Sequence, residues 1–152
     1  MLIGVISDTH GLLRPEAIEA LRGSGWIIHA GDVGDPEILE RLGEIAPVTV
    51  VRGNVDREKW AQKIPQTAVL DTGGVSIYVL HNLDEIDLNP QAAGFAAVVY
   101  GHSHVPKREE KNGVLYFDPG SAGPRRFKLP VTLGRLLVRK SQISAEIVQL
   151  LR

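Results

Sequence analysis

Cysteine is absent from this chain of 152 residues, and its absence narrows the available chemistry. Without cysteine there is no disulfide framework, no thiolate nucleophile and no thiolate metal site. Any metal ion must therefore be held by nitrogen and oxygen atoms. An excess of charge is missing too, because 17 Lys and Arg stand against 18 Asp and Glu, a formal net charge of −1. A near-zero charge provides no global attraction for nucleic acid or an anionic membrane, so we expect neither a membrane partner nor a dedicated nucleic-acid surface.

Long hydrophobic runs are also missing. The first residues, "MLIGVIS", are too short and too uncharged for a signal peptide. No apolar run approaches the ~20 residues that a membrane-spanning helix needs. We therefore expect a cytoplasmic protein. The length is that of one domain, so residues 1–152 are expected to form a single unit with its own core.

The first part of the chain alternates short apolar segments with amphipathic ones. Asp35 fits an N-cap, and Pro36 fits the first position of the helix that follows it. Strand–helix units in succession indicate parallel strands. The expected strands are 1–7, 26–30 and 48–52, and the expected helices are 15–23 and 36–45.

The second part of the chain is typical of β hairpins. Gly73-Gly74 separates two strand-like runs, and Asn112-Gly113 separates two more. We expect one α/β domain with two sheets, parallel in its first half and largely antiparallel in its second. The expected strands are 67–71, 75–80, 95–99, 105–111, 114–118, 131–139 and 141–151.

Polar side chains follow five of these strands where each strand ends. They are Asp8, His10, Asp32, Asn54, His81, His102 and His104. In open α/β sheets, binding sites gather beyond the carboxyl ends of the strands. Buried carboxylates there need a compensating cation, and no lysine or arginine is close in sequence to Asp8 or Asp32. Metal ions would compensate them, and four imidazoles without cysteine favour Mn, Fe, Zn, Co or Ni over Mg or Ca.

Taken singly, these and nearby residues also have structural interpretations. Asp35 is expected to cap a helix, Asn54 suits a turn, and a lone His81 suits a buried core position. His29 lies inside a strand and is expected to be structural. The ordered set of "DTH", "GD", "GN", His and "GHSH" at successive strand ends favours a metal centre over these separate interpretations.

This ordered set resembles the calcineurin-like metallophosphoesterase superfamily. It is most similar to the small single-domain bacterial and archaeal phosphodiesterases, from "SDTHG" to "DPGSAGPRR". The resemblance implies a four-layer α/β/β/α sandwich of two mixed sheets flanked by helices, with a dinuclear metal centre. Manganese is the first expectation for both divalent ions, and Fe, Zn, Ni or Co are the alternatives. The resemblance implies Asp8, His10 and His104 as ligands of one ion, Asn54, His81 and His102 as ligands of the other, and Asp32 as the bridge.

Three positions depart from the pattern that the resemblance implies. Many superfamily members read "GNH" where this chain has Val55 after Asn54, and that histidine is the usual candidate to protonate the leaving group. Valine cannot do so, and this favours diesters over monoesters. The stretch after His81, "NLDEID", makes an acidic rim, and Asp118 stands where asparagine is common.

The expected reaction is in-line attack on a phosphodiester by a hydroxide bridging the two ions. Two divalent ions, two aspartates and one hydroxide leave a single positive charge that attracts phosphate. Asn54 is expected to donate a hydrogen bond to the phosphate as well as to bind an ion. Arg125 and Arg126 are candidates for a second phosphate oxygen, with a solvated loop as the alternative. His10 and Asp56 are the remaining candidates to protonate the leaving group.

Other functions stay open at this point. The substrate is expected to be a small phosphate ester, and a nucleotide-like or cyclic diester is a guess. The alternatives are a phosphomonoesterase with the same site, a non-catalytic scaffold similar to the retromer subunit of eukaryotes, and a metal-stabilised domain without turnover. All seven ligand positions carry competent side chains, which favours the enzyme over the scaffold. A homodimer is left open.

Overall fold

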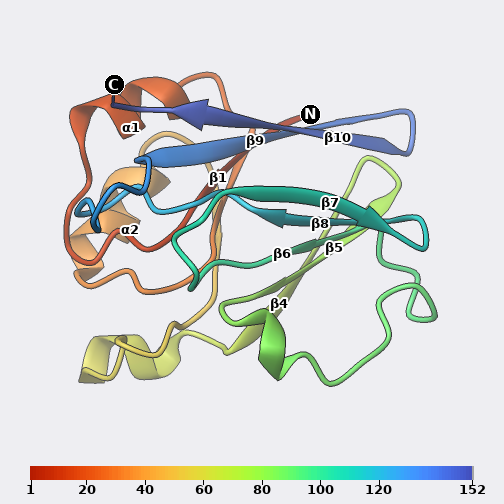
Figure 1. The fold of residues 1–152 in the computed structure, drawn as a ribbon, viewed down its shortest axis with the longest axis horizontal. Coiled ribbons are helices and arrows are strands. Elements are labelled where there is room, and N and C mark those ends of the chain that lie inside the picture. The colour runs from red at the N-terminus through yellow and green to blue at the C-terminus, as the bar shows by residue number, and fades with distance from the viewer. Residues whose placement is uncertain (152) are drawn as a thin grey trace.

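Two five-stranded sheets lie face to face in the computed structural model, which describes residues 1–151 (Figure 1). The first sheet has the order β10-β9-β1-β2-β3, with bounds Gln142–Gln149, Thr132–Arg139, Leu2–Ile6, Trp26–His29 and Val48–Val50. The second has the order β4-β5-β6-β8-β7, with bounds Thr67–Thr72, Val75–Leu80, Ala97–Val99, Val114–Asp118 and Lys107–Lys111.

The pairing of the strands follows the sequence prediction in most places. Strands β1, β2 and β3 are parallel, as predicted. Strand β9 pairs antiparallel with β1 and with β10, and the hairpins β4–β5 and β7–β8 are antiparallel. The second half is therefore largely antiparallel, except that β6 runs parallel to both β5 and β8. The chain crosses over after β5 and after β6, and crossover connections place strands in parallel.

Two α-helices cover the outer face of the first sheet. They are α1, Pro15–Leu21, and α2, Pro36–Gly43. Asp35 caps α2, as predicted, because its Oδ1 accepts a hydrogen bond from the Glu37 amide at 2.9 Å. Ile38 and Leu42 of α2 are buried against the same face of the sheet as Leu133 of β9. The two helices and the first sheet are therefore two of the layers of the fold.

The outer face of the second sheet is covered by the chain that follows β5. This chain contains a 3₁₀ turn, η2, Leu83–Glu85, and packs Leu83, Ile86 and Phe95 against Tyr78 and Val98. A second 3₁₀ turn, η1, Lys59–Lys63, precedes β4. The predicted α/β class with two mixed sheets is confirmed. The sequence analysis did not predict either 3₁₀ turn, and the layer over the second sheet is a 3₁₀ turn with irregular chain.

The main core fills the space between the sheets, where Val5, Ile28, Val79, Val99 and Phe117 are fully buried. The short central strands are apolar along their whole length because both of their faces are covered. Polar side chains begin where these strands end, so the core brings the candidate site together. In residues 1–151, no helix is long and apolar enough to cross a membrane.

Candidate metal centre

The loops that follow β1, β2, β5 and β6 are hydrogen-bonded to one another at the carboxyl ends of the strands. The Asp8 amide donates to Gly31 O at 3.0 Å, the His10 amide to Asp32 O at 2.9 Å, and the Gly101 amide to His81 O at 2.9 Å. Five site residues have a left-handed backbone, which the surrounding bonds must hold in place. They are Asp8 (φ 56°), His10 (46°), Asp32 (57°), His102 (75°) and His104 (64°).

Asp8 lies at the centre of this edge and is fully buried. Its Oδ2 accepts hydrogen bonds from Ser7 Oγ at 2.8 Å and from the His102 amide at 3.1 Å. Its Oδ1 has no hydrogen-bond partner in the described residues. A buried carboxylate oxygen without a partner carries a large desolvation cost, so Oδ1 indicates a place for a cation.

Three imidazoles surround that free oxygen. The Nε2 atoms of His10, His81 and His104 lie 3.8, 3.9 and 3.5 Å from Asp8 Oδ1. The Nε2 atoms of His10 and His81 also lie 3.6 and 3.2 Å from Asp32 Oδ2. The Nε2 atoms of His10 and His104 are 3.4 Å apart, which is long for a hydrogen bond. Five side chains therefore direct nitrogen and oxygen atoms into one small space.

The protonation state of His81 follows from its neighbours. Its Nδ1 lies 2.7 Å from Ala30 O, and a carbonyl can only accept, so Nδ1 carries a proton. In the neutral ring Nε2 then presents its lone pair to two carboxylates, an arrangement that needs a cation between them. Burial lowers the pKa of His81, but the hydrogen bond and charge of Asp32 and the charge of Asp8 outweigh it and raise that pKa above its usual value. A proton or a metal ion can serve as this cation.

Asp32 is held ionised in this position. Burial raises its pKa, but the nearby His81 imidazole, the hydrogen bond from the Val55 amide and the charge of His10 outweigh burial and lower the pKa to about 2. The Val55 amide lies 3.0 Å from Asp32 Oδ1. Oδ1 is thereby oriented by the backbone, and Oδ2 is left facing the imidazoles.

The candidate ligands form two groups within the described residues. Asp8, His10 and His104 make one, Asp32, His81 and His102 make the other, and the ligand atoms of each lie within 4.8 Å of one another. Asp8 Oδ1 and His81 Nε2, which lie 3.9 Å apart, are both buried and have no hydrogen-bond partner in residues 1–151. Free nitrogen and oxygen atoms of this kind fit two divalent metal ions. The assignment of individual ligands, Asn54 included, stays a prediction.

His29 is no ligand candidate, but it braces the two loops that carry Asp8, His10 and Asp32. Its Nδ1 accepts from the Gly31 amide at 3.1 Å, so its Nε2 carries the proton and donates to Thr9 Oγ1 at 3.0 Å. The Thr9 hydroxyl in turn donates to Val33 O at 2.8 Å. Burial lowers the pKa of His29 to about 4, which keeps the ring neutral. The structural interpretation of His29 agrees with this network.

Asp118 supports the loop that carries His102 and His104. Its Oδ2 accepts from Ser103 Oγ at 2.7 Å, and its Oδ1 accepts from the Gly120 amide at 2.8 Å. Burial raises the pKa of Asp118 to about 6, even though these hydrogen bonds act in the opposite direction. Ser103 lies between the two histidines, so Asp118 fixes the backbone from which both imidazoles project.

Three other candidates lie apart from the cluster or have other partners. Both oxygens of Asp56 accept backbone hydrogen bonds, from the amides of Val33, Gly34 and Gly53. This geometry favours a bracing role for Asp56, and its role as proton donor stays a prediction.

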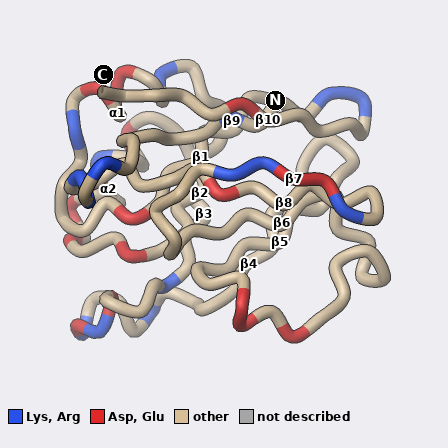
Figure 2. The backbone as a smooth tube through the Cα atoms, in the orientation of Figure 1, with Lys and Arg blue, Asp and Glu red and all other residues tan. Residues whose placement is uncertain are grey.

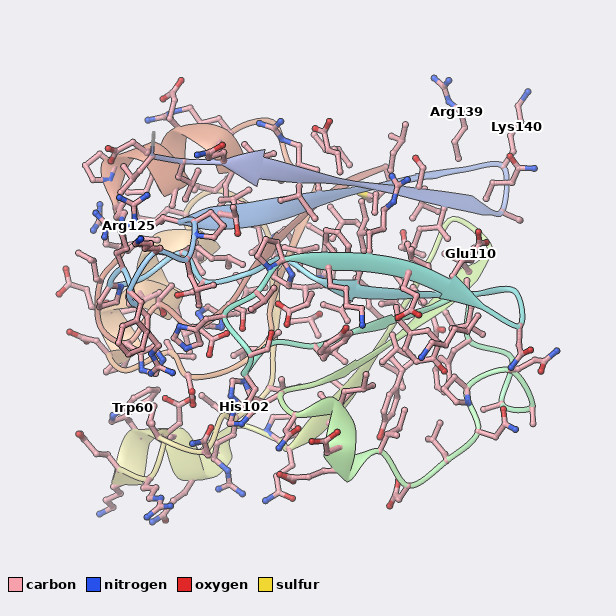
Figure 3. The ribbon with its side chains drawn as sticks, viewed as in Figure 1. Trp60, His102, Glu110, Arg125, Arg139 and Lys140 are labelled. Atoms are coloured by element: carbon pink, nitrogen blue, oxygen red, sulfur yellow. The ribbon has the colours of Figure 1, made fainter. Side chains whose placement is uncertain are left out.

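Arg125 donates from Nε to Leu129 O in an exposed loop, which Arg126 shares. Figure 3 shows Arg125 near the helices, well separated from His102, so phosphate binding by Arg125 or Arg126 also stays a prediction.

A cavity of about 580 Å³ opens beside Asn54 and His81. Arg52 and Arg57 line it, and the sequence analysis did not include either of them. Their place on both sides of Asn54 in "RGNVDR" was the available signal. The cavity is lined by the segment containing η1 and by the acidic segment after β5, and Figure 2 marks the acidic and basic positions along the backbone.

Comparison with known proteins places this fold and site in a family. Residues 1–141 match the model of the calcineurin-like phosphoesterase superfamily domain, and the chain belongs to that superfamily. The matched residues include both five-stranded sheets in large part and all the residues of the two groups of candidate ligands.

Two relatives and one solved structure illustrate the range of the match. A probable metallophosphoesterase of Methanothermobacter thermautotrophicus is 31% identical, over 98% of this chain and 92% of its own. Phosphodiesterase YfcE of Escherichia coli is 28% identical, over 86% of this chain and 84% of its own. Vps29 of Chaetomium thermophilum has a TM-score of 0.79 at 19% identity, over 97% of each chain, a likeness that shows the fold alone.

Proposed function

We propose that this protein hydrolyses phosphodiesters by attack of a hydroxide held between two divalent metal ions, which would also neutralise charge on the phosphate. The observation that carries the proposal is the unpartnered Asp8 Oδ1, with the Nε2 atoms of three histidines within 3.5–3.9 Å of it. No lysine or arginine pairs with Asp8 or Asp32 in residues 1–151. Manganese remains the first expectation for the ions, and a cytoplasmic location remains part of the proposal.

The side chains have separate tasks in this mechanism. Asp8, His10 and His104 would hold one ion, and His81, His102 and Asn54 the other, with Asp32 between them. Ser7 and the His102 amide fix the orientation of Asp8, and Ala30 O fixes the tautomer of His81. Asn54 is exposed at the border of the cavity, where its amide can donate to a phosphate oxygen.

The preference for diesters rests on Val55. This side chain is 47% exposed beside Asn54 and has no proton to give. Without a donor there, a leaving group that is already acidic, such as a phenol, should depart fastest. The name of YfcE, a phosphodiesterase, supports the same preference. A phosphomonoesterase with the same site is the second candidate.

The scaffold alternative is weaker for this chain. The likeness to Vps29 shows the fold alone, whereas a scaffold has no need for free carboxylate and imidazole atoms in one buried cluster. Six candidate ligands within two compact groups favour an enzyme. A homodimer is kept as part of the proposal.

The test is hydrolysis of bis(p-nitrophenyl) phosphate and p-nitrophenyl phosphate by metal-stripped protein, with Mn²⁺, Ni²⁺, Zn²⁺ or Mg²⁺ added back. The proposal expects metal-dependent turnover that favours the diester and that falls at least ~100-fold in Asn54→Ala. Exposed Asn89, on the segment after β5, gives the matched control Asn89→Ala, which should keep the wild-type rate. A preference for the monoester would support the second candidate. Absence of turnover with every metal would contradict both.

A further inference from the structure

The cavity beside Asn54 and His81 is lined mainly by groups that form hydrogen bonds. Side chains with an amide or hydroxyl are Asn54, Gln62, Gln66, Thr67 and Asn82. The only aliphatic side chain that lines it in the described residues is Leu80, which is 3% exposed. A volume of about 580 Å³ is that of a site for a small molecule. The lining therefore suits a ligand with many hydroxyl groups.

Charges of both signs line the cavity, and one of them is the carboxylate of Asp56, whose oxygens accept backbone hydrogen bonds. Arg52 and Arg57 line it on the segment that carries Asn54, while Glu85 and Asp87 line it on the segment after β5. None of these four side chains forms an ion pair with another residue within 1–151. A group with further phosphates would meet the two carboxylates, so an uncharged group fits better. Guanidinium and carboxylate groups can both bond to vicinal hydroxyls.

No Phe, Tyr or Trp ring lines this cavity in the part of the chain that the structure describes, and the one aromatic ring there is the His81 imidazole. Proteins that hold nucleobases commonly stack them on aromatic rings. A nucleobase would find hydrogen bonds, the guanidinium planes of Arg52 and Arg57 and the small His81 ring here, but none of the larger aromatic rings. The lining therefore favours a hydroxyl-rich group over a nucleobase.

We infer that this cavity binds a polyol, such as glycerol or a sugar alcohol, as the ester substituent that stays on phosphorus. The inference rests on the proposed phosphodiesterase function and adds the class of substrate. The polyol is the retained substituent because Val55 offers no proton to an alkoxide leaving group. The side chains of Gln62 and Gln66 are exposed and form no hydrogen bond with other residues in 1–151, so both amides can turn to the polyol and determine specificity.

The experiment uses Mn²⁺-loaded protein and chromogenic diesters that share one leaving group. The polyol esters are glycerol p-nitrophenyl phosphate and myo-inositol 1-(p-nitrophenyl phosphate), which separate an acyclic from a cyclic polyol. The comparison ester is thymidine 5′-(p-nitrophenyl phosphate). The inference expects kcat/KM at least 10-fold higher for one polyol ester than for the thymidine ester. Product affinity gives a second readout, in which glycerol 3-phosphate or inositol 1-phosphate should bind more tightly than thymidine 5′-monophosphate.

Substitutions in the cavity connect the preference to these residues. Gln62→Leu and Gln66→Leu should each lower kcat/KM for the preferred polyol ester about 3–10-fold, as loss of a neutral hydrogen bond does, and should lower it much less for bis(p-nitrophenyl) phosphate, whose retained aryl group has no hydroxyl. Gln142→Leu, on the exposed β9–β10 hairpin, is the matched control. Preference for the thymidine ester, or equal losses on all esters, would overturn the inference while the phosphodiesterase stands. No turnover of any diester would contradict the proposed function itself.

Discussion

At the scale of single residues, burial of the ionised Asp118 carboxylate costs free energy, and the hydrogen bonds to its neighbours offset this cost only in part. Asp118 is fully buried, and burial raises the pKa of its carboxyl to about 6, from an ordinary value of 3.8. The folded protein therefore binds the proton more tightly than the unfolded chain does. Between about pH 4 and pH 6 this difference makes the protein less stable as the pH rises, and above pH 6 the whole cost is present.

Asp118→Asn should remove this cost. The amide oxygen can still accept from the Gly120 amide, and the NH₂ group can donate to Ser103 Oγ, which then donates to Val105 O. We expect the variant to be more stable than wild type by about 1–3 kcal/mol at pH 7.5 and by much less at pH 4. Urea unfolding of metal-free protein at the two pH values measures this. If Asp118→Asn differed from wild type by the same free energy of unfolding at both pH values, the Asp118 carboxyl would have an ordinary pKa.

At the scale of elements, the site depends on loops that approach one another without room for a side chain. Gly53, before Asn54, shows this most clearly, because a Cβ there would lie 2.1 Å from Asp32 Oδ1 and 2.2 Å from the Asp32 amide nitrogen. The loop after β3 therefore rests directly on the loop that carries the bridging candidate. Asp32 has little freedom to move away, because the Val55 amide holds its Oδ1.

Gly53→Ala should move Asp32 and weaken metal binding. We expect a loss of about 1–3 kcal/mol in stability, as overpacking gives, and a metal affinity about 10–100-fold lower. Gly43→Ala in α2 is the matched control, since a Cβ there meets nothing within 4 Å, and its stability should stay within about 1 kcal/mol of wild type. Calorimetric titration with Mn²⁺ compares the three proteins. Similar affinity in Gly53→Ala and Gly43→Ala would show that the close contact is unimportant.

The sequence predicted the strands and the polar residues that end them, because both depend on local patterns. Asp8 and His10 follow an apolar run, and that run is a strand for reasons visible in a few residues. The sequence analysis did not predict the hydrogen bond from the His102 amide to Asp8 Oδ2, since 94 residues separate the two. The cavity was missed for the same reason. Gln62 belongs to η1 and Glu85 to η2, and both turns lack the long periodic pattern by which helices are recognised.

At the scale of the whole molecule, metal should contribute to folding. The unfolded chain has no preformed cluster, so ions bound only to the folded state stabilise it by mass action. At a free metal concentration ~1,000 times the dissociation constant, one ion adds about 4 kcal/mol. Chelation should then lower Tm by on the order of 10 °C for a domain of this size. Thermal unfolding with Mn²⁺ or with chelator measures this, and an unchanged Tm would contradict it.

The number of metal ions bound per chain tests the central claim, a centre of two metal ions, most directly. Stripped protein would be titrated with Mn²⁺ by calorimetry, and the metal content of the loaded, desalted protein measured by elemental analysis. The account predicts two ions per chain, and fewer than two for Asp32→Ala, because Asp32 Oδ2 lies 3.2 Å from His81 Nε2 in its own group and 3.6 Å from His10 Nε2 in the other. One ion or none in the wild-type protein would contradict the dinuclear centre.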